Sequence, residues 1–217
     1  MEKIKFENKS EFRAYSKEKL SKIVNPYQRD KVINKTLLEM IFRLQPRAIL
    51  LYIPLEIEVN ISPILHRLRR KHKLYVPFME GISFKMVKYR LPLHIKKFNI
   101  KEPYNSFAVK PKIDLAIVPV IGVDGALKRI GFGKGMYDRF FESLQPTPPV
   151  LFVQREMCMT HARLSEEHDI GADIYLTPQH TIIKRGHNGL RIISGRRCRS
   201  KRRSRVFHRQ KDGSSQL

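Results

Sequence analysis

Residues 113–144 read IDLAIVPVIGVDGALKRIGFGKGMYDRFFESL, and this stretch decides the fold. It begins with an apolar run, residues 113–120, that has the length and composition of a buried strand. Asp124 and Gly125 then mark a turn. From Met136 onward the apolar residues recur at helical spacing. A buried strand that leads through a glycine-rich loop into a helix is typical of an α/β protein.

The rest of the chain repeats this alternation of strands and helices. Residues 10–44 predict two helices separated near Pro26. AILLYIPL, residues 48–55, predicts a buried strand of a parallel sheet, and residues 61–72 predict a helix. Further apolar segments predict strands at residues 73–78, 84–89, 113–120, 150–153 and 174–178. The segment at residues 174–178 is expected to be the last strand of the domain. Residues 101–111 are turn-rich and are expected to form a surface loop.

Composition divides the chain into two parts after Ile183. Residues 1–183 predict a single layered α/β domain with a mostly parallel central sheet flanked by helices. Residues 184–217 hold 12 of the 43 Lys and Arg residues but one of the 20 acidic ones, without an apolar face. We therefore expect a disordered basic tail. The formal net charge is +23, and the basic body would suit an anionic substrate, although such a surface is equally common without one.

The cysteines and the N-terminus argue against secretion. Cys158 and Cys198 are far apart and have no Cys or His neighbours at metal-ligand spacing, which argues against a disulfide framework and a zinc site. No signal-peptide core is visible, and no run approaches the roughly 18 apolar residues of a membrane span. We expect a cytoplasmic monomer that does not contact a membrane.

RIGFGKGMYD, residues 129–138, is the segment that carries chemistry. Gly131, Gly133 and Gly135 alternate, so that backbone amides can approach a polyphosphate closely. The spacing fits neither the Walker A motif, which needs Ser or Thr after Gly-Lys, nor the dinucleotide pattern G-x-G-x-x-G. Taken alone, the three glycines could equally form a tight turn between a strand and a helix.

Charged residues within the loop favour phosphate binding over a simple turn. Arg129 and Lys134 can neutralise phosphate charge during transfer. The N-terminus of the following helix also favours an anion. Asp138 lies one turn into that helix, where a carboxylate can hold Mg²⁺. These residue types together predict a site for a nucleotide polyphosphate with a divalent cation.

RIGFGKGMYDR resembles the signature R-L-G-x-G-x-G-Y-Y-D of the 5-formyltetrahydrofolate cyclo-ligases, and the preceding DLAIVPVIGVDGALK matches the strand and turn of that family. The resemblance covers residues 9–178. Ile130 replaces Leu, and Met136 replaces the first Tyr, so that its ring and hydroxyl are absent. The resemblance implies an ATP-dependent enzyme that converts 5-formyltetrahydrofolate to 5,10-methenyltetrahydrofolate, with release of ADP and phosphate, by phosphorylating the formyl oxygen.

The resemblance also implies roles for individual residues. The catalytic residues would be Arg129 and Lys134. ATP would contact Lys9, Arg13, Arg129, Ile130, Gly131, Phe132, Gly133, Lys134, Gly135, Met136 and Tyr137. The folate substrate would contact Leu51, Glu56, Phe132, Gly133, Lys134, Gly135 and Met136. Mg²⁺ would be held by Asp138 and Asp169, although the residues alone leave Asp169 and Asp173 as equal candidates.

Two other functions stay open at the level of sequence. The arginine-rich tail, residues 184–217, could bind nucleic acid through its phosphates. It contains one aromatic residue, Phe207, which is few for base stacking. An α/β domain with the same nucleotide site could also act on a different substrate. Deleting the tail distinguishes the first alternative, because an enzyme would keep its activity.

Overall fold

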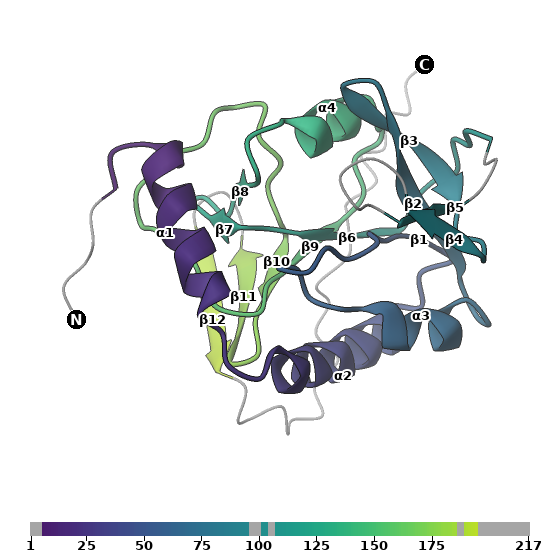
Figure 1. Cartoon of the computed structure of the whole chain (residues 1–217), viewed down its shortest axis with the longest axis horizontal. Helices are drawn as coiled ribbons and strands as arrows, with labels where there is room; N and C mark the ends of the chain where they lie inside the picture. The colour runs from purple at the N-terminus through teal and green to yellow at the C-terminus, as the bar shows by residue number, and fades with distance from the viewer. Residues whose placement is uncertain (1–5, 96–100, 104–106, 186–188, 195–217) are drawn as a thin grey trace, which may run out of the picture.

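The computed structural model describes residues 6–95, 101–103, 107–185 and 189–194, and its centre is one eight-stranded sheet. The strand order is β12-β11-β10-β9-β6-β1-β2-β3. Five neighbouring strands, from β10 to β2, are parallel, whereas β3, β11 and β12 are antiparallel to their neighbours. Helices α2 and α3 cover one face of the sheet and α4 lies on the other (Figure 1). The predicted α/β class with a mostly parallel sheet is confirmed.

Four helices are present in the part of the chain that the structure describes. Asn8 begins the first of them as an N-cap, since its side chain accepts a hydrogen bond from the Glu11 N–H at 2.9 Å. Pro26 is the first residue of the second helix, where its missing N–H costs nothing. The bounds are Lys9–Ser21 for α1, Pro26–Leu44 for α2, Ser62–Leu68 for α3 and Met136–Glu142 for α4.

The strands of the large sheet are short in its parallel centre and longer at its antiparallel ends. They are β1 Ala48–Leu50, β2 Lys73–Glu80, β3 Ser83–Lys88, β6 Leu115–Pro119, β9 Val150–Val153, β10 Ile174–Leu176, β11 His180–Arg185 and β12 Gly189–Ser194. Two small ribbons complete the fold: β4 Leu93–Ile95 with β5 Lys101–Pro103, and β7 Gly122–Val123 with β8 Arg129–Ile130.

Alternate residues of the central strands build two separate cores. Ile49 on β1 faces the core beneath α2 and α3, whereas its neighbour Leu50 faces the core beneath α4. The same alternation places Ile117 in the first core and Val118 in the second. Both faces are apolar because both are covered by helices, which explains the continuous apolar runs in the sequence.

Several predicted boundaries are wrong. The strand predicted at residues 48–55 ends at Leu50, and the residues after it leave the sheet. The surface loop predicted at residues 101–111 contains β5, which pairs with β4. The strand at residues 174–178 is not the last, because β11 and β12 follow it as a hairpin.

The disordered tail predicted from residue 184 is contradicted in its first part. β11 continues to Arg185, and β12 pairs antiparallel along the whole of it. β12 is an edge strand on which Leu190 and Ile192 are exposed, so no buried face marks it in the sequence. Residues 195–217, with most of the tail's arginines, lie outside the described residues. Among the helices of the described ranges, none combines the length and apolar character needed to cross a membrane.

Candidate active site

The candidate site lies beyond the carboxyl ends of the parallel strands, where ligands of open α/β sheets bind. The chain leaves β6 at Pro119, forms the β7–β8 ribbon and enters the glycine-rich loop, which leads into α4. Gly133 and Gly135 have φ angles of 97° and 59°, a left-handed region that side chains strongly disfavour. The loop therefore requires glycine at these two positions.

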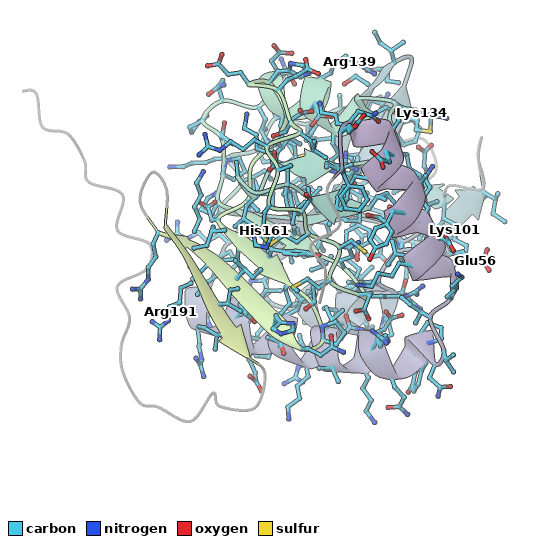
Figure 2. The ribbon with its side chains drawn as sticks, turned by 90° about the vertical axis from the view of Figure 1, so that its left-hand side faces the viewer. Glu56, Lys101, Lys134, Arg139, His161 and Arg191 are labelled. Carbon is cyan, nitrogen blue, oxygen red and sulfur yellow. The ribbon has the colours of Figure 1, made fainter. Side chains whose placement is uncertain are left out.

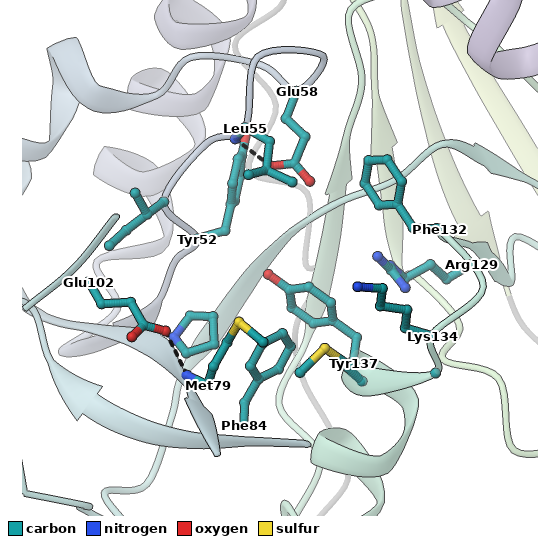
Figure 3. Close-up of a pocket in the computed structure, with 14 residues that line it drawn as sticks. Tyr52, Leu55, Glu58, Met79, Phe84, Glu102, Arg129, Phe132, Lys134 and Tyr137 are labelled. Carbon is teal, nitrogen blue, oxygen red and sulfur yellow. Dashed lines mark hydrogen bonds between the residues drawn. The ribbon is translucent and has the colours of Figure 1, made fainter. Parts of the chain in front are cut away.

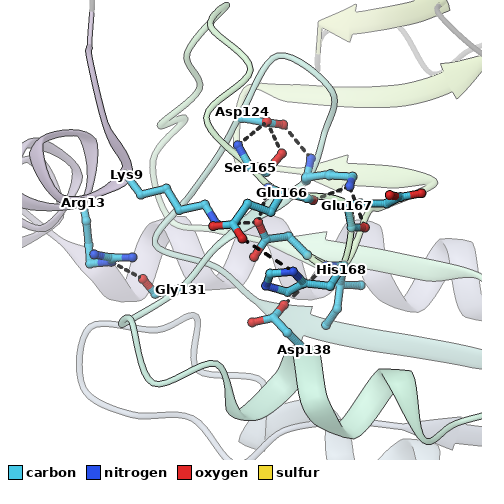
Figure 4. A network of polar contacts seen from close by, with 12 residues as sticks. Lys9, Arg13, Asp124, Gly131, Asp138, Ser165, Glu166, Glu167 and His168 are labelled. Carbon is cyan, nitrogen blue, oxygen red and sulfur yellow. Dashed lines mark hydrogen bonds and ion pairs between the residues drawn. The ribbon is translucent and has the colours of Figure 1, made fainter.

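A polar cavity of about 230 Å³ lies against this loop. It brings together cations from α1 and β8, loop glycines, and two carboxylates predicted to hold metal. Figure 4 shows Lys9 and Arg13 of α1 with Gly131, Asp138 and His168. Its lining residues are Lys9, Arg13, Arg129, Ile130, Gly131, Gly133, Gly135, Asp138, His168 and Asp169. Most of the predicted nucleotide-binding residues are thus gathered around one space, and His168 is an addition that the sequence did not single out.

Arg13 and Lys9 reach this cavity from the same face of α1. The Nε of Arg13 donates to the carbonyl oxygen of Gly131 at 2.7 Å. The Nζ of Lys9 lies 2.5 Å from Oδ2 of Asp169 and 3.2 Å from Oε1 of Glu166. Although desolvation opposes it, bonding to these carboxylates raises the pKa of Lys9, so the ammonium form prevails. The N-terminal helix is therefore fastened to both sides of the cavity.

The segment that carries Asp169 is held by two residues of the β7–β8 turn. Asp124 is fully buried, and its Oδ2 accepts a hydrogen bond from the Ser165 N–H at 3.2 Å. Lys128 Nζ donates to the carbonyl oxygen of Glu167 at 2.8 Å. These bonds place the 165–169 segment over the glycine-rich loop.

Asp138 and Asp169, the two carboxylates predicted to hold Mg²⁺, both line the polar cavity. Oδ2 of Asp169 pairs with Lys9 and accepts from the Glu166 N–H, and Oδ1 of Asp138 accepts from the Ile170 N–H at 3.3 Å, so each carboxylate has a second oxygen that could bind a cation. Mg²⁺ in nucleotide sites is usually bound by one or two carboxylates together with phosphate oxygens and water. The residues described in the structure include no cluster of three or more His, Cys, Asp or Glu that could hold a metal by themselves. The alternative, Asp173, does not line the polar cavity, and its Oδ2 accepts from the Val150 N–H at 2.8 Å at the start of β9.

A second cavity, of about 270 Å³, is mostly apolar and lies beside the first (Figure 3). The segment after β1, the β2–β3 hairpin, β5 and the glycine-rich loop with the start of α4 contribute to its wall. Its lining residues are Tyr52, Ile53, Leu55, Glu58, Pro77, Met79, Phe84, Glu102, Arg129, Phe132, Lys134, Gly135, Met136 and Tyr137. A space of this kind suits a flat organic molecule.

Two carboxylates stand out in this apolar wall. Glu58 Oε2 accepts from the Leu55 N–H at 2.9 Å, and Glu102 Oε1 accepts from the Met79 N–H at 2.7 Å. Desolvation raises the pKa of Glu58 to about 7, although its hydrogen bond and two arginines, Arg129 and then Arg155, act against it. Each carboxylate keeps an oxygen that could accept from the N–H groups of a ligand.

Arg129 joins the two cavities, because it lines both of them, as does Gly135. Its side chain is nearly buried, its Nε donates to the Pro119 carbonyl at 3.1 Å, and its guanidinium lies 4.6 Å from the centre of the Tyr137 ring. Desolvation raises the pKa of Tyr137, so its hydroxyl stays protonated and can donate. A ligand in one cavity would thus share this cation with a ligand in the other.

Two residues predicted to contact the substrate, Leu51 and Glu56, do not line the apolar cavity. Leu51 is 1% exposed and packs in the core beneath α2 and α3, outside the apolar cavity. Glu56 is exposed at the edge of the fold, and its backbone carbonyl accepts from Arg155 (Figure 2). Glu58, two residues later, lines the cavity instead. Since strand β1 ends at Leu50, strand alternation could not indicate which of the two glutamates turns inward.

The other predicted residues divide between the two cavities. Phe132, Lys134, Met136 and Tyr137 line the apolar one, whereas Gly133 lines the polar one. Sequence reasoning missed Tyr52, Phe84, Glu58 and Glu102, as well as other apolar residues of the wall. For Glu58 a signal was available, because Glu56 and Glu58 form an E-x-E pair in which either carboxylate could face the site. For Glu102 there was none, because it reaches the site on β5, a strand that the sequence did not predict.

The fold and the two cavities define an α/β protein with a polar cavity, lined by cations, glycines and carboxylates, beside an apolar one. The model of the 5-formyltetrahydrofolate cyclo-ligase family matches residues 5–178, and the chain belongs to this family of enzymes, which use ATP as co-substrate.

Individual relatives agree with this assignment. A 5-formyltetrahydrofolate cyclo-ligase of Mycolicibacterium smegmatis is 30% identical over 90 residues, 40% of this chain and 46% of that protein. The chain thus spans about half the length of this curated relative. The 5,10-methenyltetrahydrofolate synthetase of Aquifex aeolicus has a similar fold, with a TM-score of 0.68 at 23% identity over 92% of this chain and 99% of the other. That of Mycoplasma pneumoniae gives 0.64 at 20% identity over 80% and 100%.

Proposed function

We propose that this protein uses ATP to convert 5-formyltetrahydrofolate to 5,10-methenyltetrahydrofolate, with release of ADP and phosphate. The observation that carries the proposal is the pair of adjoining cavities that share Arg129. One offers cations and carboxylates to a metal-bound triphosphate, and the other offers an apolar wall with two carboxylates to a pterin. Family membership supports the same reaction.

The chemistry explains why both substrates must meet at one point. The formyl oxygen of an amide is a poor leaving group, so ring closure needs activation. Transfer of the γ-phosphoryl group breaks its bond to ADP and forms a bond to the formyl oxygen. N10 of the folate then attacks the formyl carbon and loses its proton, while the carbon–oxygen bond breaks and phosphate leaves. The transferred group has to pass the wall between the cavities, where Arg129 stands.

The residues of this chain would position the two substrates and neutralise the charge of the phosphates. Lys9, Arg13 and the loop amides would bind the phosphates, and Arg129 with Lys134 would balance the charge that develops on the transferring group. Mg²⁺ bound to Asp138 and Asp169 would screen charge between the β- and γ-phosphates.

The folate would lie along the apolar wall. Glu58 takes the role expected of Glu56, because its carboxylate faces the cavity and can accept from pterin N–H groups. Met136 keeps an apolar wall where the family has Tyr. Tyr137 and Phe132 offer aromatic surface to a flat ring.

The test is direct. The purified protein is mixed with ATP, Mg²⁺ and 5-formyltetrahydrofolate, and the near-ultraviolet absorbance of the methenyl product is followed. Product should form with equimolar ADP, and it should stop forming when ATP or Mg²⁺ is left out. A protein that binds ATP but gives no methenyl chromophore would refute the proposed substrate.

A further inference from the structure

Arg139 on α4 connects two parts of the site that are far apart in the sequence. Its Nη2 donates to the carbonyl oxygen of Lys134 at 2.6 Å and to that of Ile82 at 2.5 Å, and its Nε donates to Ile82 at 3.0 Å. Lys134 belongs to the glycine-rich loop, and Ile82 lies in the turn between β2 and β3. Figure 2 shows Arg139 on the same side of the molecule as Lys134. One side chain thus fastens a hairpin to the loop.

The bond to Lys134 sets the direction of a loop amide. In a trans peptide the carbonyl and the N–H point in opposite directions, so holding the Lys134 oxygen turns the Gly135 N–H away from Arg139. Gly135 lines both cavities, and glycine at a φ of 59° is free to adopt many other conformations, so an outside contact is needed to fix its peptide. Arg139 therefore fixes the orientation of a donor at the wall between the two cavities.

The bonds to Ile82 hold one wall of the apolar cavity. Met79 of β2 and Phe84 of β3 are directly paired in the hairpin and both line that cavity. The Phe84 ring meets the Tyr137 ring edge-on, with centroids 5.1 Å apart. The hairpin thus touches α4 through an aromatic contact near the pocket and through Arg139 at its tip.

We propose that Arg139 is a positioning residue that couples the pocket for the organic substrate to the loop that binds phosphate, an inference that rests on the proposed function. When the hairpin moves to admit a folate, Arg139 transmits the movement to the Lys134–Gly135 peptide. The reverse also holds, since a phosphate bound to that peptide fixes the hairpin. Arg139 lines neither cavity and acts through the backbone carbonyls that it holds.

The kinetic test compares Arg139→Gln with Arg29→Gln. Arg29 also donates to a backbone carbonyl, that of Arg155 at 3.1 Å, and lines neither cavity. It also forms an ion pair with Glu156, so Arg29→Gln removes an ion pair as well as a carbonyl contact and is a stringent control for stability. We expect kcat of Arg139→Gln to fall roughly 10- to 100-fold, because misplacement of reacting groups by about 1 Å can cost about 100-fold. The melting temperature should change no more than in the control. Arg139→Lys, which keeps the charge and can reach one carbonyl, should recover part of kcat.

Hydrogen–deuterium exchange of the unliganded proteins tests the coupling without any reaction. In Arg139→Gln, exchange should accelerate together in the hairpin turn, residues 80–83, and in the loop, residues 131–136, whereas Arg29→Gln should leave both segments unchanged. If the wild-type protein makes no methenyl product, the proposed function fails, and the exchange result still decides on the coupling. Unchanged exchange in either segment, or a wild-type kcat in Arg139→Gln, would overturn the proposal.

Discussion

Replacing Glu58 by Gln should stabilise the protein above neutral pH while it weakens the activity. Desolvation raises the pKa of this carboxyl from its usual 4.5 to about 7. The gap of about 2.5 between these values, at ~1.4 kcal/mol for each pKa unit, corresponds to about 3 kcal/mol. Glutamine has the same shape, and its amide oxygen can still accept from the Leu55 N–H.

The direction in which the free energy of unfolding changes with pH follows from proton binding to Glu58. Between pH 4.5 and 7 the folded protein holds a proton on Glu58 that the unfolded chain has lost, so the free energy of unfolding falls as the pH rises. Since glutamine does not titrate, the advantage of Glu58→Gln should grow from about 1 kcal/mol at pH 5 to about 3 kcal/mol at pH 8. For a domain of this size the larger value raises Tm by roughly 6–12 °C.

Thermal unfolding at pH 5 and pH 8 measures this difference, and Glu56→Gln is the matched control because Glu56 is exposed two residues away. The control should show no such dependence on pH. In the methenyl assay Glu58→Gln should lose roughly 10- to 100-fold in kcat/KM for the folate, the usual effect of removing a charged hydrogen-bond acceptor. A Tm difference that is constant or shrinks toward pH 8 would refute the reasoning.

Three further predictions concern the loop, the metal and the C-terminus. Lys134→Ala should lower kcat at least roughly 100-fold with little change in Tm, whereas Lys22→Ala, at a side chain that is 72% exposed, should change neither. Asp138→Asn should raise the Mg²⁺ concentration for half-maximal rate by roughly 10-fold or more, measured by titration. Deleting residues 195–217 should leave methenyl formation and Tm unchanged, and a loss of activity would contradict this expectation. Deleting residues 186–217 should lower Tm, because it also removes β12, which pairs with β11.

The glycine-rich loop could be predicted because its physical requirements are local. Gly133 and Gly135 adopt left-handed φ angles, which strongly favour glycine, so the loop can be recognised from its alternating glycines. Arg129 and Asp138 lie within a few residues of these glycines in the sequence, so the charged groups of the predicted phosphate site could be recognised together with the loop. The central strands were equally visible, since burial on both faces of a parallel sheet demands continuous apolar runs.

Features that depend on the path of the chain were not visible. Glu56 and Glu58 are two residues apart, and only the early end of β1 at Leu50 decides which of them reaches the cavity. Asp169 and Asp173 are likewise similar in sequence context, but only Asp169 lines the polar cavity, whereas Asp173 accepts from the N–H of Val150 at the start of β9. β12 escaped prediction because an exposed edge strand needs no apolar alternation.

The energetics of Arg129 explain why the two cavities meet where they do. Burying a guanidinium is costly unless an anion compensates for it. Among the described residues, no ion pair includes Arg129, whose direct contacts are the Pro119 carbonyl and the face of Tyr137. The Glu58 carboxylate in the same cavity acts on Arg129 electrostatically but does not pair with it. An anion that enters from either side would supply the compensating charge without displacing a protein carboxylate. Under the proposed function, a desolvated cation would thus be in place in advance of the phosphoryl group, which is the arrangement that makes electrostatic stabilisation of a transferring group effective.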